Sequence, residues 1–169
     1  NLDLNINCSK SHTMTLGNCK KKRRNRISNK VFLCQGIKLL EVPSFMYLGL
    51  MFDHRNTWGP LLVSRKLVLT KTTGAVMDFS RNLGKRPIRA LVELYCSKCV
   101  SAVLYGAEIW GYVACPDIQI QENKFLRSIL RLPQCSSVFN IHEELGVPYI
   151  GDLIALRPHI YWLKLWLRV

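Results

Sequence analysis

The spacing of apolar residues changes near Trp58, and this change divides the chain into two kinds of structure. Before it, apolar residues form short runs separated by turn residues, as in "VFLCQGIKLLEV", where we predict two short strands joined at Gln35 and Gly36. After it, apolar residues recur at helical spacing. The fold class that follows is α+β, with short strands or a hairpin in residues 1–57 and a mostly helical domain in residues 58–169.

Local signals refine this division. The stretch "SFMYLGLMFD" (residues 44–53) is aromatic and apolar, and it predicts one strand with a bend or a close backbone approach at Gly49. Residues 60–83 and 88–110 predict two helices, and Pro60 fits a first helical turn. The expected N-terminal caps of three later helices are Asp117, Asn140 and Asp152.

The segment "VLYGAEIWG" (Val103–Gly111) predicts the end of the second of these helices. Val103, Leu104, Ile109 and Trp110 are its expected core residues, and Ile118, Ile120, Phe125, Ile129 and Leu130 are those of the next helix. We expect Gly106 to admit a neighbouring backbone and Glu108 to have a basic partner or to face solvent.

The chain is strongly basic, with 24 Lys and Arg against 11 Asp and Glu and a net charge of +13. This excess favours a polyanionic partner such as nucleic acid. One basic run consists of Lys20, Lys21, Lys22, Arg23, Arg24 and Arg26; it predicts template phosphate contacts, a nuclear-localisation patch or simply a solvated loop. A second set suits a groove for a duplex read by its shape, or else solvated helix faces: Arg65, Lys66, Lys71, Arg81, Lys85, Arg86 and Arg89.

Several classes are disfavoured. The seven cysteines are scattered and no signal peptide opens the chain, so we expect a reducing, intracellular location, with nucleus and cytoplasm both open. The one C-x-x-C pair, Cys96 and Cys99, has no second pair to complete a zinc site and suits packing instead. No apolar run has the roughly 20 residues of a membrane span, so we expect no membrane partner.

Five stretches in order along the chain resemble segments of the reverse transcriptases of LINE-type, non-LTR retrotransposons. They are "LNINCSKSHTM" (Leu4–Met14), "FMYLGLMFD" (Phe45–Asp53), "VLYGAEIWG" (Val103–Gly111), "IQENKFLRSILRLP" (Ile120–Pro133) and "ELGVP" (Glu144–Pro148). The resemblance implies that the chain runs from the end of the palm, through the primer grip, into the thumb. RNA and DNA, as a template–primer hybrid, are the partners it implies.

The resemblance also assigns roles to residues. Phe45, Tyr47, Leu48 and Gly49 match the primer-grip segment, although an ordinary half-buried strand would have the same residue types. Lys10 matches the lysine of the family's segment after the palm. The resemblance implies that this lysine is a general acid, which donates a proton to the leaving pyrophosphate in the intact enzyme; the alternative is a solvated loop lysine.

The catalytic aspartates of such enzymes have no match here. Mg²⁺ is expected for the intact enzyme, but the five aspartates of this chain include no adjacent pair, so we expect the catalytic centre to lie before Asn1 and this fragment to hold no cofactor or metal. Whether the parent is an active polymerase stays open, and the alternative is a non-enzymatic, basic nucleic-acid-binding remnant. The sequence predicts no oligomeric state.

Overall fold

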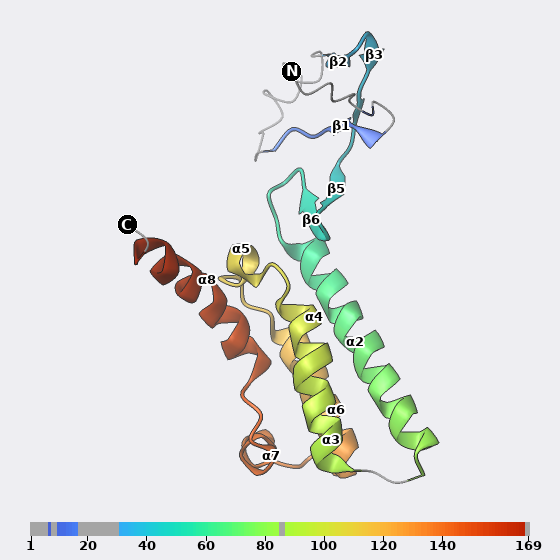
Figure 1. The fold of residues 1–169 in the computed structure, drawn as a ribbon, viewed down its shortest axis with the longest axis vertical. Coiled ribbons are helices and arrows are strands. Elements are labelled where there is room, and N and C mark those ends of the chain that lie inside the picture. Colours follow the sequence, from blue (N-terminus) through green and yellow to red (C-terminus); the bar gives the residue numbers. More distant parts are fainter. Residues whose placement is uncertain (1–6, 8–9, 17–30, 85–86, 168–169) are drawn as a thin grey trace. The chain divides into compact units, whose positions relative to one another are not determined.

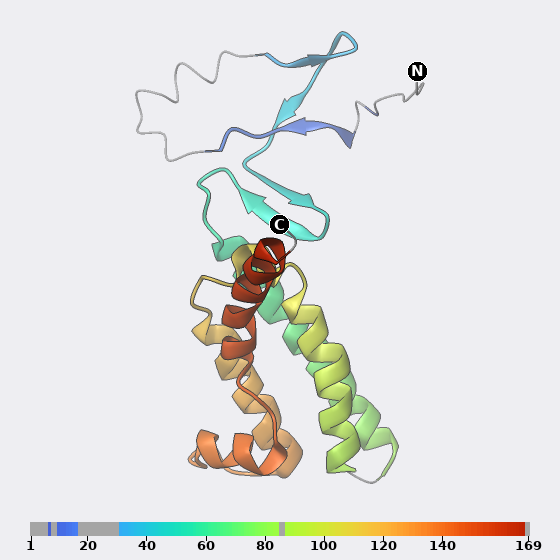
Figure 2. The same ribbon diagram turned by 60° about the vertical axis from the view of Figure 1, so that its left-hand side comes forward.

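The chain folds as the predicted α+β class, with short strands followed by helices (Figures 1 and 2). The computed structural model describes residues 7, 10–16, 31–84 and 87–167. Two compact units divide the chain, Asn1–Leu61 and Leu62–Val169. The assignment of these parts to a palm end and a thumb stays a prediction.

Three short strand pairs lie within the described residues of the first unit. They are β1 (His12–Thr13) with β4 (Leu40–Glu41), parallel; β2 (Leu33–Cys34) with β3 (Ile37–Lys38), antiparallel; and β5 (Ser44–Tyr47) with β6 (Leu50–Asp53), antiparallel. The predicted turn between β2 and β3 is confirmed, since Gln35 and Gly36 have φ angles of 51° and 80°. Two successive residues with positive φ give the turn geometry that matches the twist of a tight hairpin.

The prediction of one bent strand over residues 44–53 is wrong, because this stretch is a complete hairpin. Tyr47 pairs with Leu50 across a two-residue turn made of Leu48 and Gly49. Both turn residues have positive φ, 47° and 75°. Gly49 thus reverses the chain rather than bending a single strand.

The second kind of structure begins with a long helix, α2 (Gly59–Asn82). Pro60 lies in its first turn, as predicted. Every fourth residue along one face is buried, in the series Leu61, Arg65, Leu69, Thr73 and Met77. A spacing of four residues keeps side chains on one stripe of an α-helix.

The predicted helix over residues 88–110 forms, but in four pieces. They are α3 (Ile88–Leu94), the π-helical turn η2 (Tyr95–Val100), α4 (Ser101–Leu104) and α5 (Ala107–Trp110). The break between α4 and α5 lies at Gly106, whose φ of 72° cannot continue a right-handed helix. Figures 1 and 2 both show α3, η2 and α4 running alongside α2.

Gly111 is a glycine that another backbone approaches closely, while the close approach expected at Gly106 stays a prediction. A Cβ at Gly111 would overlap the carbonyl oxygen of Ile154 and touch the ring of Pro158, both in α8 (Ile150–Trp166). Pro158 has no N–H to donate to the carbonyl four residues before it, which is that of Ile154. The glycine therefore lets α5 pack against α8 at the carbonyl that the proline leaves without its helical donor.

Two more helices, α6 (Pro116–Leu130) and α7 (Val138–Leu145), precede α8. The predicted caps are wrong, since the capping positions are Cys115, Ser137 and Tyr149 instead of Asp117, Asn140 and Asp152. The Ser137 hydroxyl oxygen accepts the N–H of Asn140 at 3.5 Å. Asp117 and Asp152 lie in first turns, where a carboxylate still interacts favourably with the helix dipole.

The core of the second unit lies where α4, α5 and α6 meet α8, and where α3 and η2 pack against α6. Its fully buried side chains include Leu91, Tyr95, Val103, Trp110, Ile118, Leu126, Ile150 and Ile154. Of the predicted core residues, Ile109 and Ile120 are wrong, since both are half exposed. No helix within the described ranges is both long and apolar enough to cross a membrane.

Candidate nucleic-acid interface

The β5–β6 hairpin carries the residues that match the primer-grip segment. Phe45 is partly buried beside the His12 ring, with 5.3 Å between ring centroids. Tyr47 and Leu48 lie at the tip, with 59% and 70% of their surface exposed. The hairpin therefore presents an aromatic and an aliphatic side chain to solvent at its turn.

The turn itself holds a residue type that is unfavourable there. Leu48 has the left-handed φ of 47°, which costs a residue with a Cβ roughly 1–2 kcal/mol relative to glycine. Asn or Gly would fit this position without that cost. A strained, exposed leucine at a loop tip is the kind of outlier that points to a binding role.

An open hollow of about 310 Å³ lies beside the hairpin within the first unit. Its walls are mostly apolar and aromatic: His12, Thr13, Met14, Leu16, Val42, Phe45, Tyr47 and Phe52. The first strand pair and the hairpin form it together, because β1 and β5 supply His12 and Phe45. The hollow adds apolar surface next to the tip residues.

Lys10 and Asp53 flank these strands at their ends. Lys10 lies two residues before β1 and is exposed. Its backbone N–H donates to the Asn7 carbonyl. Asp53 ends β6, where its carboxylate accepts the Thr57 hydroxyl at 2.9 Å and the Arg55 N–H at 3.3 Å. Burial alone would raise the pKa of this carboxyl. The two hydrogen bonds and the neighbouring His54 together lower the pKa by more, so the net shift is downward. Asp53 is thus fully used in holding the turn into α2.

Some of the predicted cations of α2 have exposed side chains, and one is buried. Lys66 is partly exposed, and its Nζ lies 3.2 Å from an Asp117 carboxylate oxygen on α6. Arg81 contacts Asp78 at 2.6 Å on the same helix. Lys71 is exposed, and no ion pair joins it to the described part of the chain. Carboxylate neighbours therefore offset part of the positive charge at Lys66 and Arg81.

Arg65 does not lie on an exposed groove face. It is only 6% exposed, its Nη1 donates to the Ala102 carbonyl at 3.3 Å, and its guanidinium lies 5.4 Å from the Tyr105 ring centre. Burial lowers its pKa. The sequence held a signal for this, because Arg65 is four residues from both Leu61 and Leu69 in the buried stripe.

The remaining predicted cations have mixed positions. Arg89 on α3 is almost wholly exposed, with a loose contact of 3.7 Å to Glu93. Lys85, Arg86 and the basic run Lys20, Lys21, Lys22, Arg23, Arg24 and Arg26 lie outside the described residues. In the structure, therefore, Lys66, Lys71, Arg81 and Arg89 lie at the surface, whereas Arg65 is buried.

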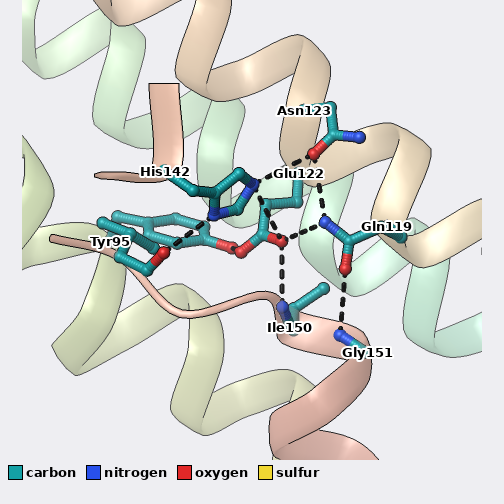
Figure 3. Close-up of polar contacts among 8 residues, drawn as sticks. Tyr95, Gln119, Glu122, Asn123, His142, Ile150 and Gly151 are labelled. Carbon is teal, nitrogen blue, oxygen red and sulfur yellow. Dashed lines mark hydrogen bonds and ion pairs between the residues drawn. The ribbon is translucent and has the colours of Figure 1, made fainter. Parts of the chain in front are cut away.

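A buried polar network that the sequence did not reveal joins η2, α6, α7 and α8 (Figure 3). At its centre is Glu122 of α6, which is 0% exposed. One carboxylate oxygen accepts the Tyr95 hydroxyl at 2.5 Å. The other accepts the Gln119 amide at 2.6 Å and the N–H of Ile150 at 2.9 Å. Burial raises the pKa of Glu122 even though these three donors act against that shift.

The network caps α8 from another helix. Tyr149 at the N-cap supplies no side-chain bond, but Glu122 accepts the N–H of Ile150 and Gln119 accepts that of Gly151 at 3.0 Å. The first N–H groups of a helix have no partner within it, so acceptors must come from elsewhere. This explains why Asp152 is not needed as a cap.

His142 of α7 joins the same network. Its Nδ1 lies 2.8 Å from the Val147 carbonyl and its Nε2 lies 3.2 Å from the Asn123 side-chain oxygen, while its ring stacks on Tyr149. Because both carboxylate oxygens of Glu122 accept hydrogen bonds and no solvent reaches it, the arrangement is a scaffold that fixes η2, α6, α7 and α8. The sequence signal was a single acid, Glu122, four residues after Ile118 and three before Phe125.

The described residues do not fit a two-metal polymerase centre. Such a centre needs several carboxylates around ions roughly 4 Å apart. Within the described ranges, no group of three or more His, Cys, Asp or Glu side chains could hold a metal ion. Asp53, Asp78 and Asp117 each have the separate partners given above.

Comparison with known proteins gives a distant similarity. Over 131 residues, 75% of its length, the chain is 25% identical to a Drosophila melanogaster protein described as "Probable RNA-directed DNA polymerase from transposon BS". No family model and no solved structure matches the chain. The aligned part spans 14% of that protein's length. The similarity supports a relationship to the reverse transcriptases of transposable elements, whereas the LINE type and the palm-to-thumb position stay predictions.

Proposed function

We propose that this chain grips nucleic acid as the primer-grip and thumb portion of an RNA-directed DNA polymerase of LINE type. The observation that carries the proposal is the β5–β6 hairpin, which exposes Tyr47 and Leu48 at a strained two-residue turn. The distant similarity to a transposon polymerase supports the same direction. A template–primer hybrid of RNA and DNA is the proposed ligand.

The proposed division of labour follows from side-chain chemistry. Tyr47 and Leu48 would pack against sugars and bases at the primer end, where apolar contact and stacking are available. Lys71 and Arg89 would contact phosphates, with Lys66 and Arg81 able to exchange their carboxylate partners for phosphate. The intact enzyme would use Mg²⁺, and Lys10 would act as its general acid. We expect the 169-residue chain alone to extend no primer.

One variant separates binding from folding at the hairpin. Leu48→Asn places a residue that tolerates positive φ at the turn and removes the apolar side chain. We expect it to keep or raise thermal stability while weakening binding to a labelled RNA–DNA hybrid with a recessed primer end by about fivefold to tenfold. Fluorescence anisotropy would measure the affinity and circular dichroism the melting.

A matched control is Leu33→Asn, because Leu33 is a similarly exposed leucine of the same unit on β2. It should leave hybrid binding unchanged. Equal affinities for native chain and Leu48→Asn would exclude the hairpin as a grip.

The second candidate function is a non-enzymatic, basic nucleic-acid-binding remnant, favoured by the net charge of +13. It predicts binding without preference for a primer end. Hybrids with recessed and blunt ends should then bind equally, whereas a primer grip predicts tighter binding to the recessed end. Lys71→Glu weakens binding under both functions, and Lys164→Glu on α8 serves as the charge-matched control.

A further inference from the structure

A second surface, on the outer side of α6, differs from the hairpin in both charge and composition. Here α6 and the segment leading into α7 enclose a groove of about 380 Å³. It is lined by Ile120, Asn123, Lys124, Arg127, Ser128, Leu132, Gln134 and Val138. The volume lies in the lower part of the range found for ligand pockets.

The groove is built by helical periodicity. Ile120, Asn123, Lys124 and Arg127 follow the spacing i, i+3, i+4, i+7, so they share one face of α6. The opposite face carries Glu122 and the buried core residues Phe125 and Ile129. Arg127 donates through Nη2 to the Ser136 carbonyl at 3.1 Å, and this bond holds the following loop against the helix.

The polar lining consists largely of donors. Lys124 and Arg127 are cationic, and no acidic residue lines the groove. Asn123 uses its oxygen in the buried network, accepting from Gln119 and contacting His142, and Figure 3 shows its amide nitrogen directed away from that network. These groups suit a carboxylate, which accepts hydrogen bonds and carries the opposite charge.

The apolar lining points to a peptide rather than to nucleic acid. Ile120 and Leu132 are 50% and 40% exposed, and Val138 completes the apolar wall. No aromatic side chain lines the groove, so bases would find no surface to stack on. A helical peptide with apolar anchors flanked by acids would bury these side chains and place carboxylates by Lys124 and Arg127.

From the positive charge of Lys124 and Arg127 and the exposed apolar residues beside them, we propose that the groove binds an acidic, amphipathic peptide segment of a partner protein. The groove shares no residue with the proposed nucleic-acid contacts on α2, α3 and the hairpin. It therefore stands or falls independently of the polymerase assignment.

The test uses the full chain and a designed probe, a fluorescein-labelled helical peptide with leucines at i, i+3, i+4 and i+7 and glutamates between them. Anisotropy should show saturable binding. Lys124→Glu and Ile120→Ser should each weaken it by about tenfold, since both side chains are exposed parts of the groove. Lys71→Glu is the charge-matched control; it should leave peptide affinity unchanged while weakening binding to the RNA–DNA hybrid.

Circular dichroism melting of each variant verifies that the fold is kept. A probe with glutamine in place of every glutamate should bind about tenfold more weakly. Absence of peptide binding, or equal binding by the native chain and both groove variants, would overturn the proposal. So would Lys124→Glu weakening hybrid binding without affecting the peptide, because the groove would then be a nucleic-acid surface.

Discussion

Glu122 shows how one buried residue can organise several elements. Its carboxylate accepts the Tyr95 hydroxyl, the Gln119 amide and the N–H of Ile150, so α6 is tied to η2 and to the start of α8. A buried polar group is favourable only when its partners remain in place. The residue is therefore more informative about stability than about chemistry.

Replacing Glu122 by leucine should destabilise the helical unit far more than replacing it by glutamine. Glu122→Leu leaves three buried donors without acceptors, and we expect a loss of roughly 3–5 kcal/mol in the free energy of unfolding. Glu122→Gln keeps a carbonyl oxygen for Ile150 and Gln119 and should lose less. Urea unfolding followed by circular dichroism measures both, and similar losses would argue against the network.

The pH dependence of stability should also identify Glu122. Burial raises its pKa in the folded chain above the ordinary value of 4.5, so the folded state binds more protons than the unfolded state. Stability from this group is fully present below about pH 4.5 and declines as the pH rises through the folded pKa. The native chain should lose stability relative to Glu122→Gln as the pH rises from 4 to 7. A constant difference across this range would contradict the raised pKa.

At the scale of elements, the contact between α5 and α8 depends on Gly111. A Cβ there would overlap the Ile154 carbonyl, which is backbone and cannot move aside alone. Gly111→Ala should therefore cost roughly 1–3 kcal/mol of stability. Gly74→Ala in α2 is the matched control, because a Cβ at Gly74 meets nothing within 4 Å. It should gain about 0.5–1 kcal/mol. Thermal melting of both variants gives the comparison, and equal shifts would refute the close approach.

The sequence predicted which elements form better than it predicted where they end. Helical spacing correctly indicated α2, and the Gln35–Gly36 pair correctly indicated a hairpin. The break at Gly106 was missed because Tyr105 to Ala107 continue the apolar pattern through a residue with positive φ. The caps were missed because α8 receives its acceptors from α6, which a local search for Ser, Asp or Asn cannot find.

Within the candidate site, the hairpin and the cations also show features that a local sequence pattern does not predict. "MYLGL" looks like a continuous strand because Leu48 is a poor turn residue, and only the positive φ at two positions reveals the reversal. Arg65 counts as a surface charge by residue type alone. Its burial depends on Tyr105 and Ala102, which are far along the chain and invisible to a local pattern.

For the whole molecule, the sequence gives the net charge, but it does not show which cations are exposed and which have carboxylate partners. The net charge is +13, yet Lys66, Arg81 and Arg89 all have carboxylate neighbours and Arg65 is buried. Exposed ion pairs of this kind contribute only about 0–1 kcal/mol each, so a phosphate can displace the carboxylate at little cost. The proposed phosphate contacts of these helical cations therefore depend on exchanging a carboxylate partner for a phosphate.

The proposed phosphate contacts predict a steep dependence of nucleic-acid binding on salt concentration. If roughly six phosphates are contacted, the logarithm of the association constant should fall with the logarithm of salt concentration at a slope of about −4 to −5, because each contact releases condensed counterions. Anisotropy titrations of the RNA–DNA hybrid at several salt concentrations give the slope. Lys71→Glu should reduce its magnitude by about one, since a phosphate contact is lost. Leu48→Asn should weaken binding at every salt concentration and leave the slope unchanged, because an apolar contact releases no ions. A flat response in the native chain would rule out phosphate contacts as the source of affinity.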